Sequence, residues 1–208
     1  MTQLTSQLIT FKAGDLTLEG ALHLPERTPA PGVVVCHPHP LYGGDMDNNV
    51  VMTACRSLNE RGIAALRFNF RGAGNSEGEH DGGDAETEDV RAALAHLSSL
   101  PEIDNDRIGL IGYSFGAIVA SEVASGDLRA FGLISPPVEF ADIKLAWGCP
   151  ALIIGGDMDH LAPPERLEIV AQAPGVEVFL VSGADHSWWG CEDELGEAIG
   201  AFFANHMR

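Results

Sequence analysis

One stretch decides the fold: Arg107-Ile108-Gly109-Leu110-Ile111-Gly112-Tyr113-Ser114-Phe115-Gly116-Ala117-Ile118-Val119-Ala120. An apolar run typical of a buried strand ends at Gly112, and small, helix-compatible residues begin at Gly116. Between them the sequence reads Gly-x-Ser-x-Gly, a pattern in which a serine occupies a sharp strand-to-helix turn and glycines remove side chains that would clash there. Ser114 would then lie at a helix N-terminus, where backbone amides favour a developing negative charge. The stretch predicts a nucleophilic serine at the end of a central strand.

The flanking sequence predicts alternating strands and helices. Residues 8–12 and 16–24 alternate in polarity across a turn, which predicts an antiparallel hairpin at a sheet edge. Further strands are expected at 33–36, 63–70, 107–113, 130–134, 151–154 and 176–181. Helices are expected at 47–60, at 84–98 with Asp84 as its cap, and at 115–124, 164–172 and 192–206. This order predicts an α/β fold with a mostly parallel sheet, an antiparallel N-terminal edge hairpin and helices on both faces.

The 208 residues are expected to form a single domain, 1–208, because one hydrophobic core commonly serves about 200 residues. The loop 135–148 has no room for a helical lid, so no cap domain and an open site are expected. The N-terminal segment Met1-Thr2-Gln3-Leu4-Thr5-Ser6 lacks a basic region followed by an apolar core, and no apolar run approaches about 18 residues. No signal peptide or membrane span is therefore expected.

Composition and charge limit the function classes. Hydrophobic residues make up 45% of the chain and charged residues 20%, which excludes a disordered chain. The net charge of −18 repels nucleic acid and anionic membranes, so a neutral or weakly charged small molecule is the expected partner. The alternative is that the acidic excess serves only to keep the protein soluble. Four widely spaced cysteines without a C-x-x-C motif favour buried thiols over disulfides or zinc ligands. A cytoplasmic protein, monomeric or homodimeric, is expected.

The partners that a serine nucleophile needs occur downstream. A serine hydroxyl attacks well only when a base takes its proton and an acid orients that base. Asp157 and Asp159 both follow the predicted strand at 151–154, and His186 follows the strand at 176–181. Ser114, an aspartate and His186 therefore occur in the chain order of a Ser-Asp-His triad, each just past a strand.

Several motifs together resemble a known family. They are His37-Pro38-His39-Pro40-Leu41-Tyr42-Gly43-Gly44, Arg67-Phe68-Asn69-Phe70-Arg71-Gly72-Ala73-Gly74-Asn75-Ser76-Glu77-Gly78, the serine turn, Gly156-x-x-Asp159 and Asp185-His186. Across nearly its whole length the chain resembles the α/β-hydrolases, and among them a small, lidless bacterial branch with a His-Pro-His-Pro loop. The resemblance implies Ser114 as nucleophile, His186 as base and Asp159 as the orienting acid. Asp159 is preferred because it fits the family's Gly-x-x-Asp spacing, and Asp157 would then stabilise its loop.

An oxyanion hole needs two backbone donors. The amide of Phe115, directly after the nucleophile, is expected to supply one. The second is expected from the His-Pro-His-Pro loop, where Pro38 and Pro40 have no N–H, so His39 and Leu41 remain. We favour His39, because it occupies the place after the family's usual His-Gly pair.

Other residues near these motifs receive supporting roles. His37 is expected to brace the loop through hydrogen bonds. Tyr42, Trp188 and Trp189 are candidate substrate-pocket residues, and packing against the closing helix is the alternative for the two tryptophans. Three further histidines are expected on solvated surfaces: His80, His96 and His206.

Functions of other classes compete with this hypothesis. A metal hydrolase could draw ligands from His37, His39, Asp45, Asp47, Asp159, His160 and His186, but no H-E-x-x-H motif is present. A dinucleotide site is disfavoured because the third glycine after Gly72 and Gly74 falls one residue late. A noncatalytic ligand-binding protein of the same fold is also disfavoured, because such a protein would not need Ser, Asp and His at three strand ends. The predicted function is a serine hydrolase of small esters or thioesters, with amides as another substrate class, that uses no metal or organic cofactor.

Overall fold

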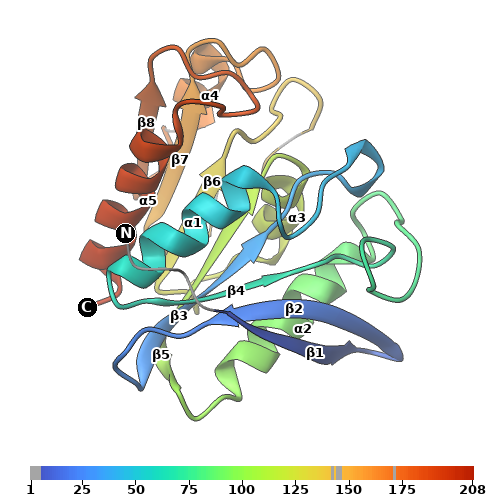
Figure 1. Cartoon of the computed structure of the whole chain (residues 1–208). Helices are drawn as coiled ribbons and strands as arrows, with labels where there is room; N and C mark the ends of the chain where they lie inside the picture. Colours follow the sequence, from blue (N-terminus) through green and yellow to red (C-terminus); the bar gives the residue numbers. More distant parts are fainter. Residues whose placement is uncertain (1–5, 142, 144–146, 171) are drawn as a thin grey trace.

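The computed structural model describes residues 6–141, 143, 147–170 and 172–208, which form an eight-stranded sheet flanked by helices (Figure 1). The strands are β1 (Gln7–Ala13), β2 (Leu16–His23), β3 (Ala30–Cys36), β4 (Ala64–Phe68), β5 (Ile103–Tyr113), β6 (Ala130–Ile134), β7 (Ala151–Gly156) and β8 (Val176–Val181). The helices are α1 (Asn49–Glu60), α2 (Glu86–Ser98), α3 (Phe115–Val123), α4 (Pro164–Val170) and α5 (Glu192–His206), with a 3-10 turn, η1 (Pro40–Tyr42).

The sheet follows the order β1-β2-β4-β3-β5-β6-β7-β8. The first two strands form an antiparallel hairpin, and β2 also pairs antiparallel with β4. From β4 to β8 every pair is parallel, so the carboxyl ends of these strands meet at one edge of the sheet. The expected α/β fold with an antiparallel N-terminal edge is confirmed, and β5, which carries the serine turn, lies in the middle of it.

Two layers of helices bury the two faces of the sheet. Helices α2, α3 and α4 share one apolar core with the sheet, and α1 and α5 share the other (Figure 1). The strands β3, β4, β6 and β7 are buried along their whole length, which explains why they read as continuous apolar runs in the sequence. Burial on both faces makes this sheet a rigid support for the loops at its carboxyl edge.

The boundary predicted for α2 was wrong. The helix begins at Glu86 rather than Asp84, because the carboxylate of Asp81 accepts a hydrogen bond from the amide of Ala85 (3.1 Å). The side chain of Glu86 also turns back, and it accepts a hydrogen bond from the amide of Gly83 (2.8 Å). These carboxylates bond to amides that precede the helix, and the N-cap residue, Ala85, makes no side-chain capping bond.

No helix or strand occurs among the described residues between β6 and β7, where a cap would be inserted. Residues 142 and 144–146 of the expected open loop lie outside the described residues, as do residues 1–5, on which the expected lack of a signal peptide rests, and residue 171. Within the described part of the chain, the helices are all too short or too polar to cross a membrane.

Candidate active site

The serine turn has the strained geometry that the sequence predicts. Ser114 joins β5 to α3 with φ 54° and ψ −119°, a conformation that side-chain-bearing residues rarely adopt. A Cβ atom on Gly116 would lie 2.5 Å from the carbonyl oxygen of His37, and one on Gly112 would overlap the backbone of Gly116. The two glycines are therefore required because backbone segments approach closely around the serine.

The structure brings the three predicted triad residues together. Nε2 of His186 lies 2.9 Å from Oγ of Ser114, and Nδ1 lies 2.9 Å and 3.0 Å from the carboxylate oxygens of Asp159. The Asp159 side chain is fully buried, and the amides of Leu161 and Ala162 donate to its Oδ1 at 2.9 Å and 3.1 Å. The carboxylate is thus fixed on one side by backbone donors and on the other by the imidazole.

The competing acid lies elsewhere in the same loop. Oδ2 of Asp157 accepts a hydrogen bond from the hydroxyl of Ser182 (2.9 Å), and its Oδ1 accepts one from the amide of Gly183 (2.6 Å). These bonds tie the loop after β7 to the loop after β8. The geometry therefore places Asp159, and not Asp157, against the histidine.

Electrostatics keep this assembly in a defined protonation state. Burial alone would raise the pKa of Asp159, but hydrogen bonds and charge from His186, with smaller contributions from Ser135 and Leu161, lower it below its ordinary value. Tyr113 donates a hydrogen bond from its hydroxyl to the carbonyl oxygen of His186 (2.6 Å), and burial raises its pKa, so the phenol stays protonated. Asp159 is thus ionised beside the imidazole, and Tyr113 fixes the backbone of His186.

The His-Pro-His-Pro loop leads into η1. His39 caps this turn, and its Nδ1 accepts a hydrogen bond from the amide of Leu41 (3.2 Å). The Leu41 amide therefore already has an acceptor. The ring of His39 packs against the rings of Tyr42, Phe115 and His80, with centroids 4.7, 4.9 and 4.6 Å away.

His37 anchors the start of this loop. Its Nε2 accepts a hydrogen bond from the amide of Phe70 (3.0 Å), so its Nδ1 carries the proton and donates to the carbonyl of Pro38 (2.6 Å). Its ring is fully buried, and burial lowers its pKa to about 4. Neither nitrogen is available to a ligand, which agrees with the expected bracing role.

A cavity of about 340 Å³ opens beside the serine. Its lining residues come from the His-Pro-His-Pro loop with η1, the start of α1, the serine turn after β5 and the two loops after β7 and β8: Pro38, His39, Tyr42, Gly43, Gly44, Asn48, Asn49, Tyr113, Ser114, Leu161, His186, Ser187 and Trp189. Two predicted pocket residues, Tyr42 and Trp189, are among them, and their side chains are 88% and 74% exposed. Sequence reasoning missed Asn48, Asn49 and Leu161, although the first two follow the His-Pro-His-Pro loop closely enough to have been considered.

Trp188 does not line the cavity, and the alternative, packing against the closing helix, is confirmed for it. Its side chain is fully buried in the core shared by α1 and α5, and its Nε1 donates a hydrogen bond to Oγ of Ser135 (3.0 Å). Its backbone is left-handed, with φ 64°, in the turn after His186. The chain reverses within this turn, so two adjacent tryptophans have opposite environments.

Other histidines and carboxylates also differ from expectation. His80 is not solvated, because its side chain is only 9% exposed, and half-buried His96 stacks on Phe11 with centroids 5.3 Å apart. Asp47, a candidate metal ligand, forms an ion pair with Arg67. Over the described residues, no group of three or more His, Cys, Asp and Glu side chains has an arrangement that could hold a metal ion.

Comparisons with known proteins agree with this geometry. Residues 16–150 match the profile of the family described as X-Pro dipeptidyl-peptidase (S15 family). RP471 of Rickettsia prowazekii (strain Madrid E), described as uncharacterized, is 33% identical over 206 residues, which cover 92% of this chain and 86% of RP471.

Solved structures extend the likeness over nearly the whole chain. An α/β serine hydrolase homologue from Coxiella burnetii has a TM-score of 0.84 at 35% identity, over 97% of this chain and 98% of the other. XC6422 from Xanthomonas campestris, described as a serine hydrolase without lid, has a TM-score of 0.82 at 30% identity, over 97% and 94% of the two chains. The chain therefore belongs to the α/β-hydrolase superfamily, in the family described as X-Pro dipeptidyl-peptidase (S15 family).

Proposed function

We propose that this hydrolase cleaves small carboxylic esters or thioesters through an acyl-enzyme intermediate. The observation that carries the proposal is the continuous chain of contacts from Asp159 through His186 to Ser114, with 2.9 Å at each end of the imidazole. An ionised, buried acid, an oriented base and a strained serine at the mouth of a cavity are the parts that acyl transfer requires.

In the first half-reaction, Oγ of Ser114 bonds to the substrate's carbonyl carbon while Nε2 of His186 takes the hydroxyl proton. The resulting imidazolium is stabilised by Asp159. When the tetrahedral intermediate collapses, the bond to the alcohol or thiol breaks, and His186 returns the proton to this leaving group. Water then attacks the acyl-enzyme with His186 again as base, which releases the carboxylic acid and restores Ser114.

The negative charge on the tetrahedral oxygen requires donors. We assign them to the amides of Phe115, at the N-terminus of α3, and His39, in the oxyanion loop. The bond from the Leu41 amide to the His39 ring supports this choice, since it leaves His39 as the loop donor next to the serine.

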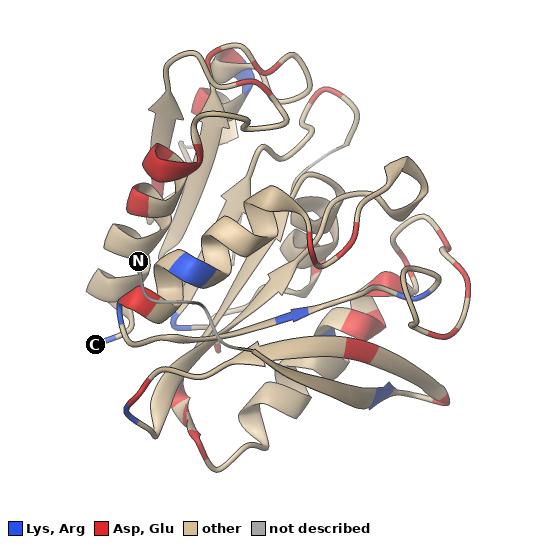
Figure 2. Ribbon diagram, in the orientation of Figure 1, with Lys and Arg blue, Asp and Glu red and all other residues tan. Residues whose placement is uncertain are grey.

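The surroundings of the cavity favour uncharged substrates. Its lining contains no Lys or Arg, and its rim carries the exposed apolar side chains of Tyr42, Leu161 and Trp189. The whole chain carries 30 Asp and Glu against 12 Lys and Arg, and acidic residues dominate the visible loops and helix ends (Figure 2). A small neutral acyl group is therefore the proposed substrate, because a carboxylate or phosphate would meet no countercharge. Four free cysteines support a cytoplasmic location as part of the proposal.

A substrate panel tests the proposal. It should contain p-nitrophenyl esters of increasing chain length, acyl thioesters and, because of the family's description, X-Pro p-nitroanilides. Turnover of the short esters or thioesters, insensitive to EDTA, is expected. If only the X-Pro anilides react, peptidase activity replaces ester hydrolysis as the function of this site.

The nucleophile itself is tested by Ser114→Ala. This change should lower kcat by about 10⁶-fold and abolish labelling by a fluorophosphonate probe, because no other side chain can take the place of Oγ. Near-full activity of Ser114→Ala would end the serine mechanism. If the probe fails to label the unaltered, folded protein, a noncatalytic ligand-binding function becomes the better interpretation.

A further inference from the structure

Behind the oxyanion loop lies a second histidine that the mechanism does not use. His80 belongs to the loop between β4 and α2, and its side chain is only 9% exposed. Its ring centroid lies 4.6 Å from that of His39 and 5.2 Å from that of Phe115. His80 therefore contacts the side chains of both residues whose amides are assigned to the oxyanion.

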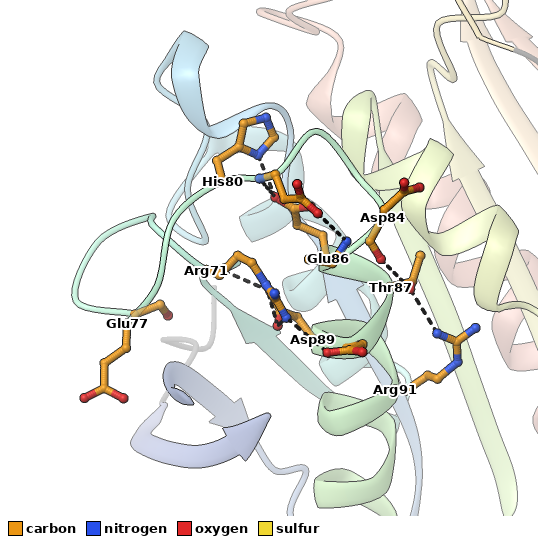
Figure 3. Close-up of polar contacts among 12 residues, drawn as sticks. Arg71, Glu77, His80, Asp84, Glu86, Thr87, Asp89 and Arg91 are labelled. Carbon is orange, nitrogen blue, oxygen red and sulfur yellow. Dashed lines mark hydrogen bonds and ion pairs between the residues drawn. The ribbon is translucent and has the colours of Figure 1, made fainter. Parts of the chain in front are cut away.

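A buried carboxylate lies against this histidine. Oε1 of Glu86 lies 2.7 Å from Nδ1 of His80, and the Glu86 side chain is fully buried (Figure 3). The amides of Asp81 and Gly83 donate to the same carboxylate at 3.0 Å and 2.8 Å. Burial alone would raise the pKa of Glu86, but these hydrogen bonds and the charge of His80 lower it. An ionised carboxylate thus ties the segment directly after His80 to the first turn of α2.

We propose that His80, anchored by Glu86, is a positioning residue that holds His39 and Phe115 in the geometry of the oxyanion hole. This inference rests on the proposed function. Donors stabilise the transition state only when they lie about 2.7–3.1 Å from the oxyanion, so a small displacement of either residue costs rate rather than substrate affinity.

The contacts of His39 explain why a ring is needed at position 80. On one side the Leu41 amide and the ring of Tyr42 hold the His39 imidazole, and His80 and Phe115 pack against it as well. The bond from Leu41 requires an unprotonated Nδ1 on His39. Burial and the neighbouring His80 both lower the pKa of His39 and so preserve that bond. Without a ring at position 80, His39 and Phe115 lose a shared packing partner.

The test compares His80→Ala with His80→Phe, on the most active ester of the panel. His80→Ala should lower kcat by about 10- to 100-fold, while KM changes by less than about 3-fold. His80→Phe keeps the ring, and Glu86 keeps its two amide donors, so this variant should recover kcat to within about 3-fold of the unaltered protein. The rate of fluorophosphonate labelling should follow kcat in both variants.

Asp89→Asn is the matched control. Asp89 lies one turn further along α2, is also fully buried, and also ties the loop to the helix, through Arg71 (Nη2 to Oδ1, 2.7 Å; Figure 3). Among the described residues, the hydrogen bonds of the Asp89 carboxylate go to the amide and guanidinium of Arg71, not to His39 or Phe115. Its substitution should lower the melting temperature at least as much as His80→Ala and leave kcat within about 2-fold.

The inference would be overturned, while the proposed function stands, if His80→Ala retained kcat within about 2-fold or lost no more kcat than Asp89→Asn. It would also be overturned if His80→Phe were as slow as His80→Ala. Should His80→Ala fail to fold, His80→Leu, which fills the space without a flat ring, is judged by the same criteria. An unaltered protein that neither turns over the panel nor reacts with the probe would overturn the proposed function and this inference together.

Discussion

Among the described residues, two fully buried carboxylates lie against a histidine, and one of these two histidines faces a serine hydroxyl. In both, the carboxylate side chain is fully buried and lies close to Nδ1 of its histidine, at 2.9 Å for Asp159 and His186 and at 2.7 Å for Glu86 and His80. Nε2 of His186 meets Ser114, whereas the ring of His80 packs against aromatic rings. A carboxylate beside a histidine is therefore not evidence of catalysis by itself. The role of the histidine depends on the group that its other ring nitrogen, Nε2, contacts.

The two pairs also differ in how the chain assembles them. Asp159 and His186 come from separate loops after β7 and β8, and the parallel sheet brings those loops to one edge. His80 and Glu86 come from one continuous segment that ends in the first turn of α2. A local pair stabilises its own loop, while a pair built across strands can be aimed at a third group.

The largest expected difference between the pairs is in turnover. Asp159→Asn should lower kcat by about 10⁴-fold, because the amide no longer orients the imidazole or stabilises its charged form. Steady-state kinetics on the best ester measures this. Asp157→Asn is the control and should leave kcat unchanged within about 3-fold, since Asp157 bonds to Ser182 and Gly183. A larger loss at Asp157 would reverse the assignment of the acid.

Glu86→Gln should act mainly on stability. The amide of glutamine offers one acceptor oxygen where the two carboxylate oxygens now accept from the amides of Asp81 and Gly83, so a buried donor loses its partner. The free energy of unfolding should fall by about 1–3 kcal/mol, measured by urea denaturation. The loss of kcat should stay near or below 10-fold, in line with a positioning role. A loss as large as that of Asp159→Asn would make the two pairs equivalent and contradict the comparison.

Acid should destabilise the protein partly through both pairs. The folded protein lowers the pKa of Glu86 below 4.5 and that of Asp159 below 3.8, so each contributes stability that is present above these values and lost as the pH falls through the lowered pKa. Urea midpoints at about pH 5 and pH 3 should therefore differ, and the difference should shrink in Glu86→Gln. An undiminished difference in that variant would show that Glu86 is not ionised in the folded state.

The smallest expected effect concerns the two tryptophans that follow His186 in the chain. Trp189→Ala should raise KM by about 2- to 5-fold for the longer esters, because it removes apolar surface from the cavity rim. Stability should change little, since the side chain is 74% exposed. Trp188→Phe should instead lower the melting temperature without changing KM, because Trp188 belongs to the core. The reverse pattern would mean that the two side chains exchange places in solution.

Adjacent residues show where sequence reasoning reaches its limit. Trp188 and Trp189 are adjacent residues of the same type, yet the first is buried and the second is exposed at the cavity. The backbone of Trp188 is left-handed, and this turn points the two side chains in different directions. Asp157 and Asp159 are also equivalent as residue types, and the family spacing, rather than any local pattern, favoured the correct neighbour of His186. No sequence pattern indicated the contacts of His80, because His39 and Phe115 lie in distant segments of the chain.

The sequence by itself determined the order of strands and helices, the strained turn at Ser114 and the chain order of the triad. These depend on hydrophobic periodicity and on glycines required by backbone contacts, both of which are local properties. Only the tertiary structure decided which tryptophan lines the cavity and which histidine packs against His39, and it supplied the distances that join Asp159 to His186. Distances between side chains on separate loops are set by the packing of the whole sheet and its two helix layers. No short stretch of sequence contains that information.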